Sequence, residues 1–175
     1  SLLAYRGATN AIVLALPRGG VPVGVEVAQS LGLPAQPELA MGAIASGGAL
    51  VLNEDVLRFA DRREAALEQV RRREQVELER RERQFRGARP PLQMAGRTGI
   101  LVDDGLATGA TMEVAVRALR DLGAARIVVA VPVASPEARN RIAAVADEVV
   151  CLEVPANFSA VGQWYQDFGQ TSDEE

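Results

Sequence analysis

Short apolar runs that alternate with helical stretches constrain the fold of this chain more than any other feature. We predict strands at residues 100–102, 127–133 and 148–152, because each is a short and nearly continuous aliphatic run. Two helices are predicted between them. The first spans about residues 109–122 and is closed by Gly123; the second follows the N-cap Ser135, with Pro136 at its first position, and runs to about residue 146. This order predicts an α/β fold, a doubly wound and mainly parallel sheet flanked by helices.

The N-terminal part adds one more strand and one more helix. Residues 11–16 predict a buried strand, residues 17–20 a turn, and residues 21–31 a helix that stops at Gly32. A second parallel strand should follow, but the prolines of residues 33–37 predict none. Either the sheet skips a strand here, or a segment near residues 33–36 is missing from this chain. Further on, residues 41–45 and 49–52 flank a glycine pair and predict a hairpin.

Residues 61–86 differ from the rest of the chain because they carry nine arginines and seven acidic residues. Several pairs, such as Glu68 and Arg72, lie four positions apart in the favourable order for a helix. We therefore predict a long and mostly solvated helix, inserted into a single domain that spans residues 1–175. The interleaved glutamates favour an exposed charged face over a nucleic-acid-binding surface.

The composition excludes several kinds of site. The chain has no histidine, all 19 of its basic residues are arginine, and its net charge is −4. These counts exclude histidine bases, Ser-His-Asp triads, His-ligated zinc and lysine phosphate loops within this chain, and they argue against a broad nucleic-acid footprint. The single cysteine, Cys151, lies in an apolar run and predicts a buried, inert thiol. No apolar run approaches the roughly 18 residues that span a bilayer and no signal peptide is visible, so we expect a cytoplasmic protein without a membrane partner.

Residues 100–111 carry the clearest chemical signal. Asp103 and Asp104 follow a predicted strand, at the end of a parallel sheet where ligands bind. The turn after them is rich in small residues and leads into a helix N-terminus, which suits backbone amides that bind an oxyanion. Thr108 and Thr111 add hydroxyl groups. The segment therefore predicts a site in which the aspartates hold sugar hydroxyls and the turn holds a phosphate, whereas the alternative is an acidic turn that only caps the helix. It is neither a Walker loop nor a dinucleotide fingerprint.

This segment resembles the phosphoribosyl pyrophosphate (PRPP) motif of type I phosphoribosyltransferases, which has an apolar strand, two acidic residues, three variable positions and Thr-Gly-x-Thr. Residues 16–24 resemble the pyrophosphate loop of the same family, and residues 37–45 and 131–134 resemble a bacterial subgroup of predicted members. The resemblance implies the type I phosphoribosyltransferase fold and the transfer of the 5-phosphoribosyl group of PRPP to a nitrogenous base or a related acceptor, with release of pyrophosphate. One departure is that no strand and basic residue lie between the first helix and residue 37, which removes a charged contact to pyrophosphate if the deletion is real.

The resemblance also assigns roles to individual residues. Asp103 and Asp104 would hold the ribose hydroxyls, and Arg18, with the amides of Gly19 and Gly20, would hold the pyrophosphate; Asp103, Asp104 and Arg18 are the expected catalytic residues. Magnesium would arrive on the pyrophosphate of the substrate, so no protein-held metal site is expected. The 5-phosphate would lie against the turn formed by Gly105, Leu106, Ala107, Thr108, Gly109, Ala110 and Thr111.

The acceptor site and the function leave alternatives open. Phe158, Trp164, Tyr165 and Phe168 either stack on a planar base or pack the C-terminal segment onto the domain. The charged helix at residues 61–86 either covers the site or makes a homodimer contact. Besides the transferase, two other functions fit the pattern: a catalytically silent regulator that binds PRPP or a nucleotide, and, more distantly, a structural or RNA-binding protein that uses the arginine-rich helix.

Overall fold

The structure is a computed structural model that describes residues 1–17, 19–35 and 92–168. The predicted hairpin at residues 41–52 and the predicted charged helix at residues 61–86 lie outside the described residues, as does Arg18.

Four parallel strands form the sheet within the described residues. They are β1 (Ala11–Ala15), β2 (Thr98–Val102), β3 (Arg126–Val133) and β4 (Glu148–Glu153), in the order β1-β2-β3-β4. Val13 lies opposite Ile100, and Ile100 lies opposite Val128. Every residue of β1 and β2 is buried, as expected for aliphatic strands that are covered on both faces. The predicted parallel sheet is confirmed.

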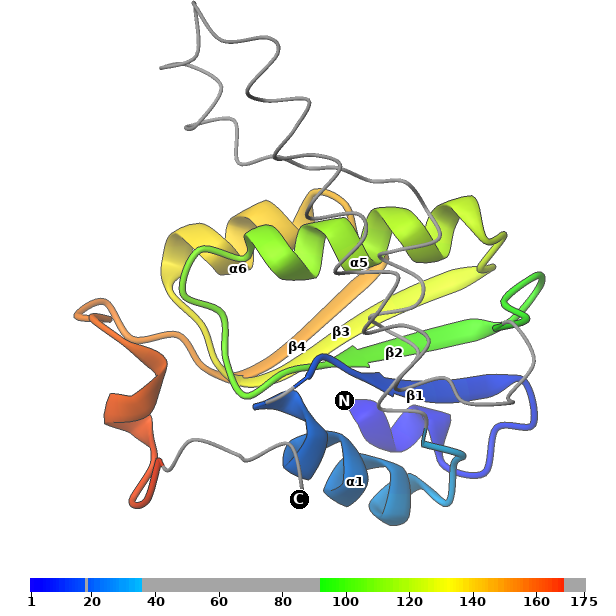
Figure 1. Cartoon of the computed structure of the whole chain (residues 1–175), viewed down its shortest axis with the longest axis horizontal. Helices are drawn as coiled ribbons and strands as arrows, with labels where there is room; N and C mark the ends of the chain where they lie inside the picture. The colour runs from blue at the N-terminus through cyan, green and yellow to red at the C-terminus, as the bar shows by residue number, and fades with distance from the viewer. Residues whose placement is uncertain (18, 36–91, 169–175) are drawn as a thin grey trace, which may run out of the picture.

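Helices cover both faces of this sheet. Helix α1 (Gly20–Leu31) lies on one face, and α5 (Ala110–Asp121) and α6 (Pro136–Ala143) lie on the other (Figure 1). Two short 3₁₀ helices, η1 (Leu2–Tyr5) and η2 (Val161–Trp164), complete the described elements. Successive strand residues point to opposite faces and fill two separate apolar cores, so that Ile12 and Leu14 pack under α5 and α6 whereas Ala11 and Val13 pack under α1. The doubly wound fold class is therefore confirmed.

The helix ends follow local signals in the sequence. Gly32 ends α1 in a left-handed conformation with φ of +63°, which glycine adopts without strain. The Ser135 hydroxyl accepts a hydrogen bond from the Ala138 N–H at 3.0 Å and so caps α6. Helix α6 ends at Ala143, earlier than the predicted residue 146. Four residues later the Asp147 carboxylate accepts a hydrogen bond from the Ile127 N–H, near the start of β3, at 2.7 Å.

The described residues after α1 form no strand, in line with the expectation for residues 33–37, but they make one isolated contact with β1. The Val13 N–H donates a hydrogen bond to the Pro34 carbonyl at 3.0 Å, and Ala35 forms a single parallel bridge with Val13. A proline lacks an N–H but its carbonyl can still accept, so it can begin a pairing at the side of β1 that faces away from β2. After α1 the chain therefore reaches the edge of β1 that faces away from β2. After α5 and α6 it continues to β3 and β4, on the edge of β2 that faces away from β1.

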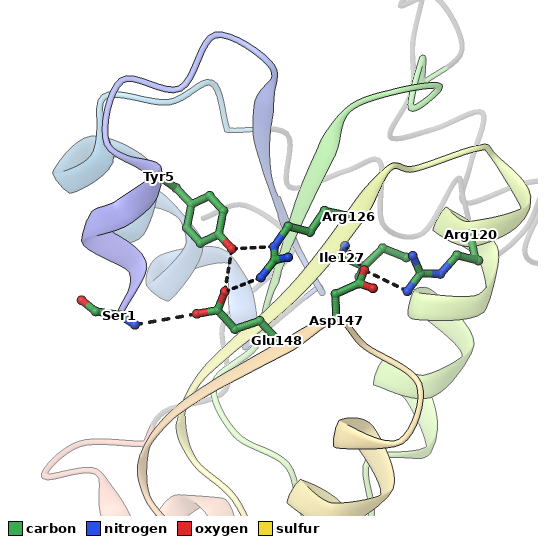
Figure 2. Close-up of polar contacts among 7 residues, drawn as sticks. All are labelled: Ser1, Tyr5, Arg120, Arg126, Ile127, Asp147 and Glu148. Atoms are coloured by element: carbon green, nitrogen blue, oxygen red, sulfur yellow. Dashed lines mark hydrogen bonds and ion pairs between the residues drawn. The ribbon is translucent and has the colours of Figure 1, made fainter.

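Polar side chains link η1 to the N-terminal ends of β3 and β4. Figure 2 shows the Tyr5 hydroxyl, which donates to Glu148 at 2.6 Å and accepts from Arg126 Nε at 2.9 Å, while Arg126 also donates to Glu148 at 3.1 Å. Beside them, Arg120 donates to Asp147 at 2.9 Å. The hydrogen bond from Tyr5 is the main cause that lowers the pKa of Glu148; burial opposes it and Arg126 adds to it. This network fixes η1 and the starts of β3 and β4.

Candidate functional site

The candidate site lies where the winding of the chain changes direction, between β1 and β2. In doubly wound sheets this point opens a crevice beyond the carboxyl ends of the strands, because the connections on its two sides run apart. The β1 loop enters it from one strand, with the described residues Leu16, Pro17, Gly19 and Gly20. The acid loop, residues 103–109, enters it from the other strand. The Leu16 N–H donates to the Val102 carbonyl at 2.9 Å, which keeps the two strands paired up to the point where the loops begin.

The two loops touch through glycines. A Cβ atom added at Gly19 would lie 2.0 Å from Oδ2 of Asp104, and one added at Gly20 would lie 2.7 Å from the Val102 carbonyl oxygen. A side chain at Gly20 would meet backbone atoms, and one at Gly19 would displace the Asp104 carboxylate, so this close approach depends on glycine at both positions. The structure therefore brings together Gly19, Gly20, Asp103 and Asp104, four of the residues that the sequence predicted for the site.

The paired carboxylates have unusual electrostatics. Burial and, after it, the charge of Asp104 raise the pKa of Asp103 to about 7, although the Asp104 N–H donates a hydrogen bond to Asp103 Oδ1 at 2.9 Å and opposes this rise. A carboxyl group titrates near neutrality when a second carboxylate lies beside it and water is partly excluded. Such a pair is suited to accept hydrogen bonds from hydroxyl groups or to face a positive charge.

The rest of the acid loop is anchored at its middle and open at its tip. Leu106 is buried; its N–H donates to the Val133 carbonyl at 3.0 Å and its carbonyl accepts from the Ser135 N–H at 2.9 Å. The Ser135 hydroxyl also donates to the Ala107 carbonyl at 2.8 Å. Ala107 and Thr108, by contrast, are exposed. The sequence predicted Ser135 only as a helix cap, and its second role depends on a contact 28 residues away along the chain.

The tip of the loop offers backbone N–H groups. Within the part of the chain that the structure describes, the N–H groups of Ala107, Thr108 and Gly109 have no hydrogen-bond acceptor, and the Ala110 N–H donates only to Thr108 Oγ1, at 3.4 Å. Gly109 is the N-cap residue before α5 and has a φ of +75°. Amides that cluster at the N-terminus of a helix attract an anion such as a phosphate. The Thr108 and Thr111 hydroxyls are exposed beside them.

Tyr165 is the residue of this site whose role the sequence left open. Its hydroxyl donates a 2.6 Å hydrogen bond to the Asp104 carbonyl, and burial, together with the charges of Asp104 and Asp103, raises its pKa to about 12. This contact holds the C-terminal segment against the acid loop, and stacking of the aromatic residues on a base stays a prediction. Trp164 and Phe168 are 44% and 51% exposed.

The described residues also bear on metal binding, on membrane spanning and on Cys151. Among residues 1–17, 19–35 and 92–168, no group of three metal-ligating side chains is found, and no helix is both long enough and apolar enough to cross a membrane. Cys151 is half-buried rather than buried, because its strand β4 is the last of the described sheet and is only partly covered. Burial still raises the pKa of its thiol, which is the direction expected for an unreactive cysteine.

Comparisons with known proteins agree with this arrangement. Two proteins from Mycobacterium tuberculosis, strains CDC 1551 / Oshkosh and H37Rv, each named "Putative phosphoribosyl transferase", are 47% identical to this chain over 185 residues, covering 99% of it. The chain spans 42% of the length of each relative, and the alignment is longer than the 175 residues of this chain, so the relatives carry residues without a counterpart here.

A solved structure is also similar over nearly the whole chain. The crystal structure of TT1426 from Thermus thermophilus has 43% sequence identity, covers 99% of this chain and 88% of its own, and superposes with a TM-score of 0.77. The model of the phosphoribosyl transferase domain matches residues 2–167, which include both loops of the candidate site. This chain therefore belongs to the phosphoribosyl transferase domain family.

Proposed function

We propose that this chain transfers the 5-phosphoribosyl group of PRPP to a nitrogenous base or a related acceptor and releases pyrophosphate. The observation that carries the proposal is the close approach of Gly19 and Gly20 to Asp103 and Asp104 at the carboxyl ends of β1 and β2. It sets two glycines, which have no side chains, against a pair of carboxylates at the place where a doubly wound sheet binds ligands.

The proposed binding mode divides PRPP among the two loops. Asp103 and Asp104 accept hydrogen bonds from the ribose hydroxyls, and the amides of the acid loop and the start of α5, residues 105–111, hold the 5-phosphate. The amides of Gly19 and Gly20, with Arg18, hold the pyrophosphate, which enters the site as its magnesium complex. The unpaired amides of Ala107, Thr108 and Gly109 support the phosphate position in the described part of the chain.

The proposed chemistry follows from charge. The bond between ribose C1 and the pyrophosphate oxygen breaks, and its electron pair leaves with the pyrophosphate. The ring then has oxocarbenium character, as in glycoside hydrolysis, and the negative charge of the aspartate pair favours it. A ring nitrogen of the acceptor supplies the pair for the new C1–N bond, and its proton passes to water. No step needs a histidine, which agrees with a chain that has none.

Pyrophosphate release tests this proposal. Magnesium-PRPP is incubated with the chain and a panel of purine, pyrimidine and related bases, and pyrophosphate is measured. We expect release with at least one base, and none with the Asp103→Asn, Asp104→Asn double variant, whose fold is checked by circular dichroism. Binding of PRPP without release for any base would contradict the transferase and fit a PRPP-binding regulator, and unchanged affinity in the double variant would remove the ribose assignment.

A further inference from the structure

Residues 161–168, which we call the C-terminal strap, pack against one another. The strap consists of η2 and the four residues after it. The rings of Tyr165 and Phe168 lie 5.3 Å apart between centroids, and a Cβ added at Gly162 would lie 2.9 Å from the Phe168 ring. Figure 1 shows η2, in red, beyond the carboxyl ends of the strands, on the side where the acid loop leaves β2.

The strap rests on the acid loop at Gly105. A Cβ added at Gly105 would lie 2.7 Å from one methyl group of Val161 and 3.1 Å from a methyl group of Val133. The backbone at Gly105 is therefore held between β3 and the strap. This contact brings the strap onto the peptide that joins Asp104 to Gly105.

Tyr165 holds the same peptide by a hydrogen bond. Its hydroxyl donates to the Asp104 carbonyl at 2.6 Å. In a trans peptide the carbonyl and the following N–H point to opposite sides, so a hydrogen bond that fixes the Asp104 carbonyl also fixes the direction of the Gly105 N–H. Because Asp104 and its neighbour Asp103 precede this peptide and the open amides follow it, its orientation sets the two halves of the acid loop relative to each other.

The hydroxyl is suited to donate over the whole physiological range of pH. Burial and the nearby carboxylates raise the pKa of Tyr165 to about 12, so the phenol keeps its proton near neutrality. The side chains of Asp103 and Asp104 are acceptors too, yet the hydroxyl donates to the main-chain carbonyl, which leaves the carboxylate oxygens of Asp104 for other donors.

We infer that Tyr165 is a positioning residue, which holds the Asp104–Gly105 peptide so that the aspartate pair and the loop amides bind ribose and phosphate together. The inference rests on the proposed function, and it adds a residue outside the PRPP motif to the site. Tyr165 acts through Asp104 and does not touch the substrate.

The test compares two variants that each remove one phenolic hydroxyl. Tyr165→Phe keeps the ring and its contact with Phe168 but loses the hydrogen bond to Asp104. Tyr5→Phe is the matched control, because Tyr5 also donates a 2.6 Å hydrogen bond, to Glu148, at the opposite ends of the strands. The dissociation constant of magnesium-PRPP is measured by calorimetry, and amide hydrogen exchange is measured in the 175-residue chain without ligand.

We expect Tyr165→Phe to raise the dissociation constant about tenfold, the effect of one lost hydrogen bond, and to speed amide exchange in residues 104–109. Tyr5→Phe should lower thermal stability and leave both quantities unchanged. Equal affinity in Tyr165→Phe and the unmodified chain, or an equal loss in both variants, would overturn the inference. If the unmodified chain binds no magnesium-PRPP, the proposed function fails, and unchanged exchange in Tyr165→Phe would show separately that Tyr165 does not order the loop.

Discussion

At Asp103, burial and the neighbouring Asp104 carboxylate act in the same direction and raise the pKa of the side chain to about 7, well above its usual value of 3.8. Folding therefore favours the protonated form, whereas the proposed contact with ribose hydroxyls favours the ionised form. A residue with such opposing demands costs stability in the free protein, which fits its proposed role in binding. Ser135, by contrast, anchors the acid loop through an uncharged hydrogen bond to the Ala107 carbonyl.

The first prediction concerns Asp103→Asn. Between pH 3.8 and about 7 the folded state holds a proton that the unfolded state has lost, so the stability of the unmodified chain should fall as pH rises through this window. Asparagine removes this dependence and keeps an oxygen for the Asp104 N–H. We expect the variant to be more stable at pH 8 by about 1–3 kcal/mol in urea unfolding, and equal stability at pH 8 would contradict the raised pKa.

The second prediction concerns Ser135→Ala. The variant loses both the cap on the Ala138 N–H and the hydrogen bond to the Ala107 carbonyl. We expect a loss of about 1–2 kcal/mol in unfolding free energy and weaker binding of magnesium-PRPP, because the acid loop loses an anchor. Ser30→Ala, at an exposed position of α1, is the control and should change neither. A variant that binds as tightly as the unmodified chain would show that the anchor is dispensable.

At the scale of elements, the sequence predicts what local patterns determine. The four strands lie within two residues of their predicted ends, since continuous aliphatic runs are buried on both faces wherever they pair. The acid loop was predicted because its residues are contiguous. The pairing of residues 34–35 with β1 and the hydrogen bond from Tyr165 to Asp104 could not be predicted, because each depends on which distant segments meet.

The third prediction tests the contact between the two loops. In Gly19→Ala the new methyl group would meet the Asp104 carboxylate, a side chain that can rotate away, so the fold should survive while the carboxylate is displaced. We expect affinity for magnesium-PRPP to fall at least about tenfold with little loss of thermal stability. Gly32→Ala is the matched control: it has open space but φ of +63°, so it should lose about 1 kcal/mol of stability and no affinity. Unchanged affinity in Gly19→Ala, together with a loss of affinity in Gly32→Ala, would contradict the contact between Gly19 and the Asp104 carboxylate.

At the scale of the whole molecule, the two ends of the sheet respond to pH in opposite ways. The carboxyl ends carry Asp103, whose pKa is raised, whereas the other ends carry Glu148, whose pKa is lowered, mainly by Tyr5. A lowered pKa contributes stability that is present above the unfolded value of 4.5 and is lost as pH falls through the folded value. Together these two groups make stability fall as pH rises from about 5 to 7, through Asp103, and add a separate loss as pH drops below 4.5, through Glu148.

The fourth prediction follows from this balance. In a pH series of thermal unfolding, the unmodified chain should lose stability as pH rises from about 5 to 7, and it should also lose the Glu148 contribution as pH falls below 4.5. Glu148→Gln should reduce the loss of stability below pH 4.5 without changing the decline between about pH 5 and 7, and Asp103→Asn should do the reverse. If either variant changed stability equally below pH 4.5 and between about pH 5 and 7, the two ends of the sheet would not act independently.

In the acid loop, the residue that anchors the loop to the fold is different from the residues that are exposed to solvent. Leu106 is committed to the interior and paired with β3, while Ala107 and Thr108 face solvent one position later. If the turn binds the 5-phosphate as proposed, substitutions at those two positions would change anion preference while Leu106 keeps the loop anchored. The turn is therefore a natural place for new selectivity to evolve, or to be engineered, without rebuilding the protein.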